Sequence, residues 1–535
     1  MAHIVARLVV AIALCWSQIA AASAAGTPPN IIFIVADDLG FNDISQHGSP
    51  QIPTPHIDEI ATTGTLLARY YTQPVCSPTR ASILSARHVI HTGIYMPFDH
   101  GVTNEHLNVS YTLLPSYLKR CCGYATHAVG KWHLGANTVN ATPIGRGFDT
   151  HLGYWSGAED YETHMVAGAY DFVDRLSPAV KYNNTFSTTV FAEQAVSIIL
   201  AQGAKGPAAP PLFLYLAFQN VHWPLEAPPE YIARFAHVPG DRRLVCAMAA
   251  FLDDAVGNVT GALKTAGLWD NSVVVFVSDN GGPTNGNEGT WSNNFPLRGG
   301  KNTLWEGGVR GVGLVRGPGV PVGVVNRAHV HASDWLPSLV SLATGGADFR
   351  RWAAADEPPY QPGDGMDVWQ SIVGGPAQRT WVLLETHAAG QPTVHGDGLV
   401  LGDMKLVGYG ATMPQDENGW FPPPGQDAAT TQYTVVCRDA AGGGPRTGAA
   451  PSPQACQRAK PCLFNITADP CEYHDLADSQ PALLAQLQAQ LHTYAATAVL
   501  PLKGTGCQPR LVTVAGTAGP TQAFQPCDAP GVEGW

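Results

Sequence analysis

The stretch Asn30-Ile31-Ile32-Phe33-Ile34-Val35-Ala36, which runs directly into Asp37-Asp38, is the part of this chain that most clearly indicates a fold. A short, continuous apolar run that ends in polar residues is typical of a strand covered on both faces. Residues 211–218 and 272–277 repeat the pattern, and each of them also leads into polar residues. We therefore expect three buried, parallel strands in one sheet.

Helical stretches lie between these strands, at residues 187–202 and 244–266. The alternation predicts an α/β fold with a large mixed, mostly parallel sheet flanked by helices. In open sheets of this kind, ligands bind beyond the carboxyl ends of the strands. The polar residues that follow the three strands are therefore candidate site residues: Asp37, Asp38, His222, Asp279 and Asn280.

The pattern changes after about residue 390. Residues 398–406 indicate a hairpin, residues 439–454 an exposed loop rich in Gly, Pro and Ala, and residues 481–496 an amphipathic helix. These elements predict a smaller C-terminal α+β subdomain. The expected organisation is a signal peptide over residues 1–24, a main α/β domain over residues 25–390, and the subdomain with a cysteine-rich tail over residues 391–535.

The N-terminus predicts export. Residues 1–7 include Arg7, residues 8–19 are apolar, and residues 20–25 are small, which is the layout of a secretory signal peptide cleaved near Ala24 or Ala25. A membrane anchor is the alternative, but the apolar run is too short to span a bilayer comfortably. We expect no other stretch to be long and apolar enough to do so. A signal peptide leaves lysosomal, cell-surface and secreted destinations open.

Composition narrows the class of protein. The chain has 535 residues, too many for one core, and its 45% hydrophobic and 13% charged residues indicate a globular protein. The net charge is −12 and no basic run occurs, which argues against nucleic-acid binding. An anionic ligand would have to be met by local cations.

Cysteine usage agrees with an oxidising compartment. Setting aside Cys15 in the signal and Cys76, nine cysteines remain, so at least one is free or pairs between chains. Six of the nine follow residue 430, which predicts a C-terminal region stapled by disulfides. Sequons compatible with a secreted glycoprotein occur at Asn108, Asn140, Asn183, Asn258 and Asn465.

The stretch Cys76-Ser77-Pro78-Thr79-Arg80 places a cysteine at the expected start of a helix, because Pro78 suits a first turn. Bare N–H groups and the positive end of the helix dipole favour an anion there. Arg80 lies four residues on, on the same helix face. A buried structural cysteine is the alternative interpretation of this stretch alone.

Asp37-Asp38 and Asp279-Asn280 offer hard oxygen ligands at two strand ends. Such ligands favour calcium or magnesium over zinc. One such pair would be explained by turn capping, but two pairs at matching strand ends favour a metal site. Two further stretches supply cations: Gly130-Lys131-Trp132-His133-Leu134-Gly135, which follows a short expected strand, and the Gly-rich region that contains Lys301. A lone Lys on a loop is usually solvated, and a lone His is usually structural.

Taken together, these segments resemble the sulfatase family, whose Cys-x-Pro-x-Arg cysteine is oxidised to formylglycine (3-oxoalanine), an aldehyde. The resemblance extends from Pro29 to about Asp478 and implies an alkaline-phosphatase-like fold. It looks closest to the N-acetylgalactosamine-4-sulfatases, the arylsulfatase B group. The stretches that carry it, besides residues 76–80 and 130–135, are residues 220–225, 278–282, 296–311 and 463–470.

The resemblance implies a role for each matching position. Asp37, Asp38, Asp279 and Asn280 would bind one Ca²⁺, with Cys76, once modified, as a further ligand. Arg80 and His133 would hold the hydrated aldehyde. The sulfate ester would be contacted by Lys131, His222 and Lys301. A formylglycine-generating enzyme is implied as a partner during maturation.

The implied reaction is hydrolysis of sulfate monoesters, of sulfated sugars or aryl sulfates. One hydroxyl of the aldehyde hydrate attacks sulfur and expels the alcohol, and the second hydroxyl then allows sulfate to leave as the aldehyde re-forms. Calcium and the lysines offset the charge on the sulfuryl oxygens. Either His222 or Lys301 would protonate the leaving oxygen.

One departure from the family concerns the stretch after the cysteine motif. Sulfatases often carry Leu-Thr-Gly-Arg there, whereas this chain has Leu84-Ser85-Ala86-Arg87, which bears on how efficiently Cys76 is modified. Two other classes of function are also open. A phosphoester hydrolase of the related superfamily would use Thr or Ser with a His-rich two-metal site, and an inactive, calcium-binding secreted glycoprotein would need a broken site.

Overall fold

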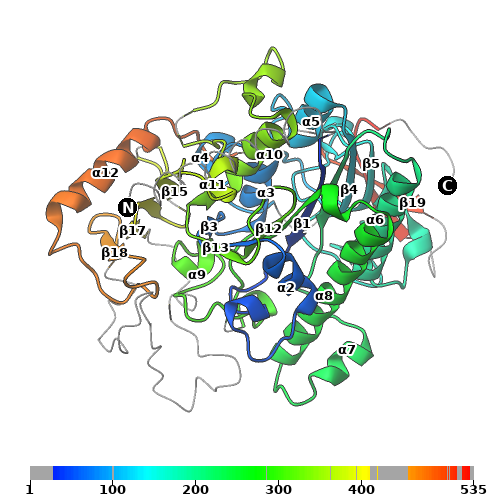
Figure 1. The fold of residues 1–535 in the computed structure, drawn as a ribbon, viewed down its shortest axis with the longest axis horizontal. Coiled ribbons are helices and arrows are strands. Elements are labelled where there is room, and N and C mark those ends of the chain that lie inside the picture. Colours follow the sequence, from blue (N-terminus) through cyan, green and yellow to red (C-terminus); the bar gives the residue numbers. More distant parts are fainter. Residues whose placement is uncertain are drawn as a thin grey trace, which may run out of the picture.

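The computed structural model describes residues 28–98, 102–284, 286–361, 363–388, 390–392, 394–409, 419, 456–502, 504, 507–514 and 521–529. The predicted signal peptide and the predicted loop at residues 439–454 lie outside these residues. Figure 1 shows a large central sheet between layers of helices. The α/β fold with a mixed sheet is therefore confirmed.

The central sheet has ten strands. Five adjacent strands, β11, β1, β10, β4 and β5, run parallel to one another, and this block is bordered on both sides by an antiparallel strand, β12 next to β11 and β8 next to β5. The order is β13 (Val324–Asn326), β2 (Thr65–Leu67), β12 (Gly313–Arg316), β11 (Ser272–Ser278), β1 (Asn30–Ala36), β10 (Leu212–Ala217), β4 (Ala125–Lys131), β5 (Thr150–Tyr154), β8 (Val173–Asp174), β9 (Ser177–Pro178).

Strand β1 is fully buried because both faces of the sheet are covered. Ile32 and Ile34 point into one core with α2 (Pro55–Thr62), α6 (Ser187–Ala204) and α8 (Arg242–Thr265). Phe33 and Val35 point into the other, with α3 (Cys76–Ser85), α5 (Leu114–Cys122) and α10 (Trp335–Thr344). Side chains alternate across a strand, so a continuous apolar run supplies both cores.

A second, four-stranded antiparallel sheet carries α12 (Pro481–Ala495), seen with its strands at the left of Figure 1. Its strands are β15 (Trp381–Glu385), β16 (Asp397–Leu401), β17 (Met404–Gly408) and β18 (Cys462–Asn465). The predicted hairpin and helix of the C-terminal subdomain are confirmed. The sheet begins at Trp381, ahead of the boundary predicted at residue 390, because β15 pairs with β16.

The last described strands of the chain lie away from the second sheet and pair with a hairpin of the main domain. Strands β19 (Arg510–Val514) and β20 (Thr521–Gln525) form a hairpin that joins β7 (Ala169–Tyr170) and β6 (Met165–Val166) in a third sheet. Figure 1 shows β19 at the opposite side from α12. The predicted 391–535 unit therefore contributes to two places in the fold, and its boundaries stay a prediction.

Disulfides Cys456–Cys462 and Cys507–Cys527 staple the C-terminal region as expected, and Cys471 is also disulfide-bonded. The free thiols among the described cysteines are those of Cys76, Cys121, Cys122 and Cys246.

Helix α8 corrects one expectation about membrane-spanning segments. It is long and apolar enough to cross a bilayer, whereas we expected no such stretch beyond the N-terminus. Of its most apolar 18-residue window, 72% is buried inside the protein, and α8 packs on α6 and α2. A helix that is apolar around most of its circumference is also what a large core requires. Residues such as Val256 and Leu263 fill that core.

Candidate active site

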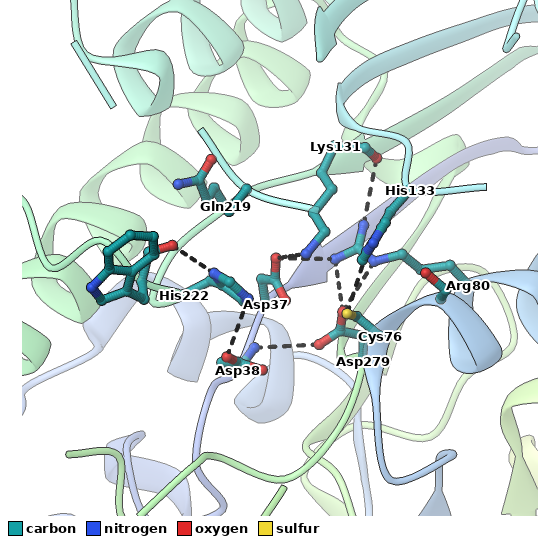
Figure 2. A network of polar contacts seen from close by, with 12 residues as sticks. Asp37, Asp38, Cys76, Arg80, Lys131, His133, Gln219, His222 and Asp279 are labelled. Atoms are coloured by element: carbon teal, nitrogen blue, oxygen red, sulfur yellow. Dashed lines mark hydrogen bonds and ion pairs between the residues drawn. The ribbon is translucent and has the colours of Figure 1, made fainter. Parts of the chain in front are cut away.

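The sheet brings the predicted acid pairs together at its carboxyl edge. Strands β1 and β11 run in parallel register, with Ala36 opposite Ser278, so Asp37-Asp38 and Asp279-Asn280 emerge side by side. Lys131 is the last residue of β4, which ends at the same edge. Figure 2 shows the side chains of Asp37, Asp38, Asp279 and Lys131 turned toward one another. All of them are at most 1% exposed.

Buried cations neutralise the buried acids. Lys131 Nζ lies 2.5 Å from Asp37 Oδ2, and Lys301 Nζ lies 2.9 Å from Asp38 Oδ2. Arg80 reaches from α3 and donates two hydrogen bonds to Asp279 Oδ2, at 3.0 and 2.8 Å. Charges buried this deeply are stable only when paired.

Two oxygens in this cluster have no hydrogen-bond partner, although both are buried. They are Asp37 Oδ1 and Asn280 Oδ1. Ligand atoms of Asp37, Cys76 and Asp279 all lie within 4.8 Å of one another. Burial raises the pKa of Asp38 to about 7, although Lys301 opposes the shift. A bound hard cation would satisfy these two unpaired oxygens and would offset the charge of the neighbouring carboxylates. The residues therefore fit calcium.

Cys76 is the first residue of α3 and is 2% exposed. Its Sγ lies 3.4 Å from His133 Nδ1, and His133 Nε2 lies 2.9 Å from the carbonyl oxygen of Phe98. Burial raises the pKa of Cys76 to about 11, against the influence of Lys131 and Lys301. The unmodified thiol is therefore protonated and is a poor nucleophile.

His222 and Lys301 face the same space with opposite protonation. Burial, Lys131 and Lys301 hold the pKa of His222 well below its usual value, while His222 Nδ1 lies 2.6 Å from the carbonyl oxygen of Trp223. Burial alone would lower the pKa of Lys301, but Asp38 and Glu288 raise it well above its usual value. His222 is thus neutral and Lys301 charged in the free protein.

A cavity of about 330 Å³ opens onto this cluster. Four of the predicted site residues line it: Cys76, His133, His222 and Lys301. Lys131, Arg80 and the acids form a buried layer next to these residues, in which Arg80 contacts Lys131, Lys131 contacts Asp37, and Asp38 contacts Lys301 of the cavity. The arrangement presents a cysteine position, two histidines and a lysine to a small ligand.

Six cavity residues were not assigned a role from the sequence, and Met96, Trp223 and Glu288 are among them. Glu288 Oε2 lies 2.6 Å from Lys301 Nζ, so it adds a carboxylate to the site. It lies between two stretches that match the family, in residues with no recognisable pattern. No sequence signal points to it, because only the turn of its loop brings it to Lys301.

The segment that carries Lys301 is held by close backbone contacts and by buried charge. A Cβ atom on Gly281 would overlap the carbonyl oxygen of Gly307, which explains the glycines on both sides of this contact. Lys405, in β17 of the second sheet, supplies the buried charge: its Nζ lies 2.9 Å from Glu306 Oε1 and 2.7 Å from Glu472 Oε1. This buried network ties the segment to the second sheet.

Comparison with known proteins identifies the family. Residues 29–346 match the sulfatase family. Arylsulfatase J of Mus musculus is 36% identical over 519 residues, which cover 92% of this chain and 80% of that protein. N-acetylgalactosamine-6-sulfatase of Sus scrofa is 30% identical over 398 residues, which cover 68% of this chain and 71% of that protein.

A solved structure agrees. The crystal structure of Ps i-CgsB in complex with k-i-k-neocarrahexaose has a TM-score of 0.69 and 26% identity, and covers 89% of this chain and 94% of that one. These comparisons support the family but not the narrower likeness to arylsulfatase B. The chain belongs to the sulfatase family and is a sulfuric ester hydrolase.

Proposed function

We propose that this protein hydrolyses sulfate monoesters of sulfated sugars, using formylglycine at position 76 and one Ca²⁺. The observation that carries the proposal is the cavity in which Cys76, His133, His222 and Lys301 converge over the buried acids. A two-metal phosphoester hydrolase would be expected to carry Thr or Ser as nucleophile and a His-rich ligand set, whereas this site has Cys76 and ligands that are mostly acids. An inactive binding protein would be expected to lack part of the set.

Asp37, Asp38, Asp279 and Asn280 would hold the calcium, and residue 76 would complete the site once modified. The orphaned oxygens of Asp37 and Asn280 support this assignment. When bound, calcium would offset negative charge on the ester oxygens. Arg80 orients Asp279 through its two hydrogen bonds, so the carboxylate is positioned as a ligand.

Formylglycine would supply the hydroxyl nucleophile that the protonated Cys76 thiol does not offer. His133 would orient it. Its ring is fixed by Phe98 on one side and lies against position 76 on the other. Burial and Lys131 hold the pKa of His133 well below its usual value, so the ring is neutral. Its Nε2–H donates to the carbonyl oxygen of Phe98, which leaves Nδ1 facing position 76 as the hydrogen-bond acceptor.

Lys131, His222 and Lys301 would contact the ester. The two lysines supply positive charge in a water-poor pocket, where an interaction with a sulfuryl oxygen is stronger than in water. The leaving alcohol needs a proton, and His222 or Lys301 would donate it. In the free protein Lys301 carries a proton, whereas His222 would gain one only as an anionic ester enters.

Relatives support sugars as the class of substrate. One is named N-acetylgalactosamine-6-sulfatase, and the structure of another, Ps i-CgsB, is a complex with k-i-k-neocarrahexaose. We propose that the chain enters the secretory pathway, meets a formylglycine-generating enzyme there, and acts outside the cell or in a lysosome.

The test is sulfate release by protein from a host that modifies Cys76. Wild-type protein should hydrolyse 4-nitrophenyl sulfate and at least one sulfated sugar, and Cys76→Ala should release none. Ser82→Ala is a matched control, since Ser82 is buried in the same helix but does not line the cavity. Equal activity of Cys76→Ala and wild type would refute the proposal.

A further inference from the structure

The mouth of the active-site cavity carries large apolar side chains above a polar floor. Trp223 is 48% exposed and Met96 is 47% exposed, and both line the same cavity as Cys76. An exposed tryptophan leaves a large apolar surface in water, which is unfavourable, and in a ligand site it offers a flat ring face and an indole N–H donor. Its neighbour His222 holds the backbone of Trp223 in place through the 2.6 Å contact with its carbonyl oxygen.

Glu288 stands at the same mouth, next to this tryptophan. Its loop passes close to Trp223 at Gly289, where a Cβ atom would lie 3.1 Å from Trp223 Cδ1. The carboxylate is fixed by Lys301 Nζ at 2.6 Å and by Asn302 Nδ2 at 3.2 Å. Burial would raise the pKa of Glu288, but Lys301 lowers it well below its usual value, so the carboxylate is ionised.

We propose that Trp223 and Glu288 form the subsite for the sugar ring that carries the sulfate. The ring lies against the indole face of Trp223, and its hydroxyl or amide N–H groups donate hydrogen bonds to Glu288. The inference rests on the proposed sulfate-ester hydrolysis, and it names the leaving-group side of that reaction. Neither residue belongs to the set that would hold the sulfate itself.

The chemistry of the two side chains defines the substrate class. An ionised carboxylate only accepts hydrogen bonds, so it favours a ring with free hydroxyl or N–H donors beside the ester. It repels a second sulfate or a carboxylate on the same ring, because like charges a few ångströms apart in a partly buried site repel one another. The expected substrate is therefore a monosulfated, otherwise uncharged pyranose.

The decisive experiment compares two substrates on each variant. The first is the monosulfated monosaccharide that wild type cleaves fastest among galactose, glucose and N-acetylgalactosamine sulfates, and the second is its disulfated analogue. Glu288→Gln should raise the ratio of kcat/KM for the disulfated over the monosulfated sugar by about tenfold, equivalent to ~1.4 kcal/mol. The ratio cancels any general loss caused by the contact between Glu288 and Lys301. A ratio within about twofold of wild type would overturn the assignment.

The stacking role of Trp223 is tested by replacing its side chain with one that has no ring and with one that has a smaller ring. Trp223→Ala should lower kcat/KM for the monosulfated sugar by about tenfold, mainly through KM, and Trp223→Phe should restore most of it. Trp291→Ala is the control, because Trp291 is 40% exposed on the neighbouring loop but does not line the cavity. Equal losses in Trp223→Ala and Trp291→Ala would overturn the stacking role.

The two proposals fail in different ways. If wild type releases no sulfate from any sugar sulfate or from 4-nitrophenyl sulfate, the proposed function fails, and the subsite fails with it. If wild type is active but the Glu288→Gln ratio and the Trp223 series stay flat, only the subsite is refuted.

Discussion

Replacing Lys405 with methionine tests how much the buried ion network supports the segment that carries Lys301. Lys405, Glu306 and Glu472 are all 0% exposed, and the lysine lies within 2.9 Å of both carboxylates. Methionine keeps the volume and the apolar stem but removes the charge. Two carboxylates then face each other without a shared cation.

The magnitude follows from these contacts. Breaking a buried ion pair from one side costs about 3–5 kcal/mol, because the remaining charge is left uncompensated. Glu306 keeps partial support from Tyr71 Oη at 3.1 Å and from Arg310 at 3.5 Å. We therefore expect Lys405→Met to lower the free energy of unfolding by about 3 kcal/mol at pH 7, the lower end of that range.

The assay is urea unfolding followed by circular dichroism, with the disulfides intact. Arg350→Met is the matched control, because Arg350 pairs with Asp348 at 2.9 Å on the surface, where the two side chains are 65% and 47% exposed. An exposed pair contributes about 0–1 kcal/mol. The penalty of Lys405→Met should shrink at pH 5, where Glu472 holds a proton. If Lys405→Met and Arg350→Met have the same small effect at pH 7, the reasoning is refuted.

Three further predictions follow from the same structure. Burial raises the pKa of Glu472 from 4.5 to about 7, so the folded state binds the proton more tightly than the unfolded state and loses stability as the pH rises from about 4.5 to 7. The free energy of unfolding of Glu472→Gln should therefore increase relative to that of wild type from pH 5 to pH 7, as measured by urea titration. Parallel pH curves for the two proteins would contradict this. Gly281→Ala should lower the free energy of unfolding by about 3 kcal/mol, because its Cβ would overlap backbone atoms. Gly261→Ala is the control in α8, where a Cβ would meet no atom within 4 Å, and it should raise the free energy of unfolding by about 0.5–1 kcal/mol in the same assay. If His222 protonates the leaving oxygen, His222→Ala should slow sugar sulfates more than 4-nitrophenyl sulfate; an equal loss for both in steady-state kinetics would give that role to Lys301.

The main sheet could be predicted because its strands are buried on both faces. Residues 30–36 have no polar interruption, so strand and site position follow from one pattern. The parallel register then places Asp37-Asp38 beside Asp279-Asn280 without further information. The flanking strands β8, β9 and β13 are two or three residues long, which is too short for a periodic signal.

Other features depend on tertiary contacts that no local pattern reports. Glu288 reaches Lys301 through a loop, and Lys405 meets Glu306 from a different sheet. The pairing of β20 with β7 joins residues more than 350 apart in the sequence, and β7 is only two residues long, Ala169–Tyr170. Helix α8 was recognised as a helix, but its burial depends on α6 and α2, which only the fold places around it.

Ala86 shows how the structure clarifies a departure noted in the sequence. It occupies the C-cap of α3 with φ 59° and ψ 13°, the left-handed region in which glycine is favoured. The family glycine at this place in the motif therefore has a backbone reason. In this chain alanine adopts that conformation, with its N–H donating to the carbonyl oxygen of Ser82.

Mass spectrometry of the tryptic peptide from Tyr70 to Arg80 tests the central claim most directly. The protein should come from a host with a formylglycine-generating enzyme, and the same sample should be assayed for sulfate release. The account predicts exchange of the Cys76 sulfur and two hydrogens for one oxygen, as the aldehyde or its hydrate, and activity that scales with the modified fraction. Sulfate release by protein in which Cys76 is entirely a thiol would contradict it.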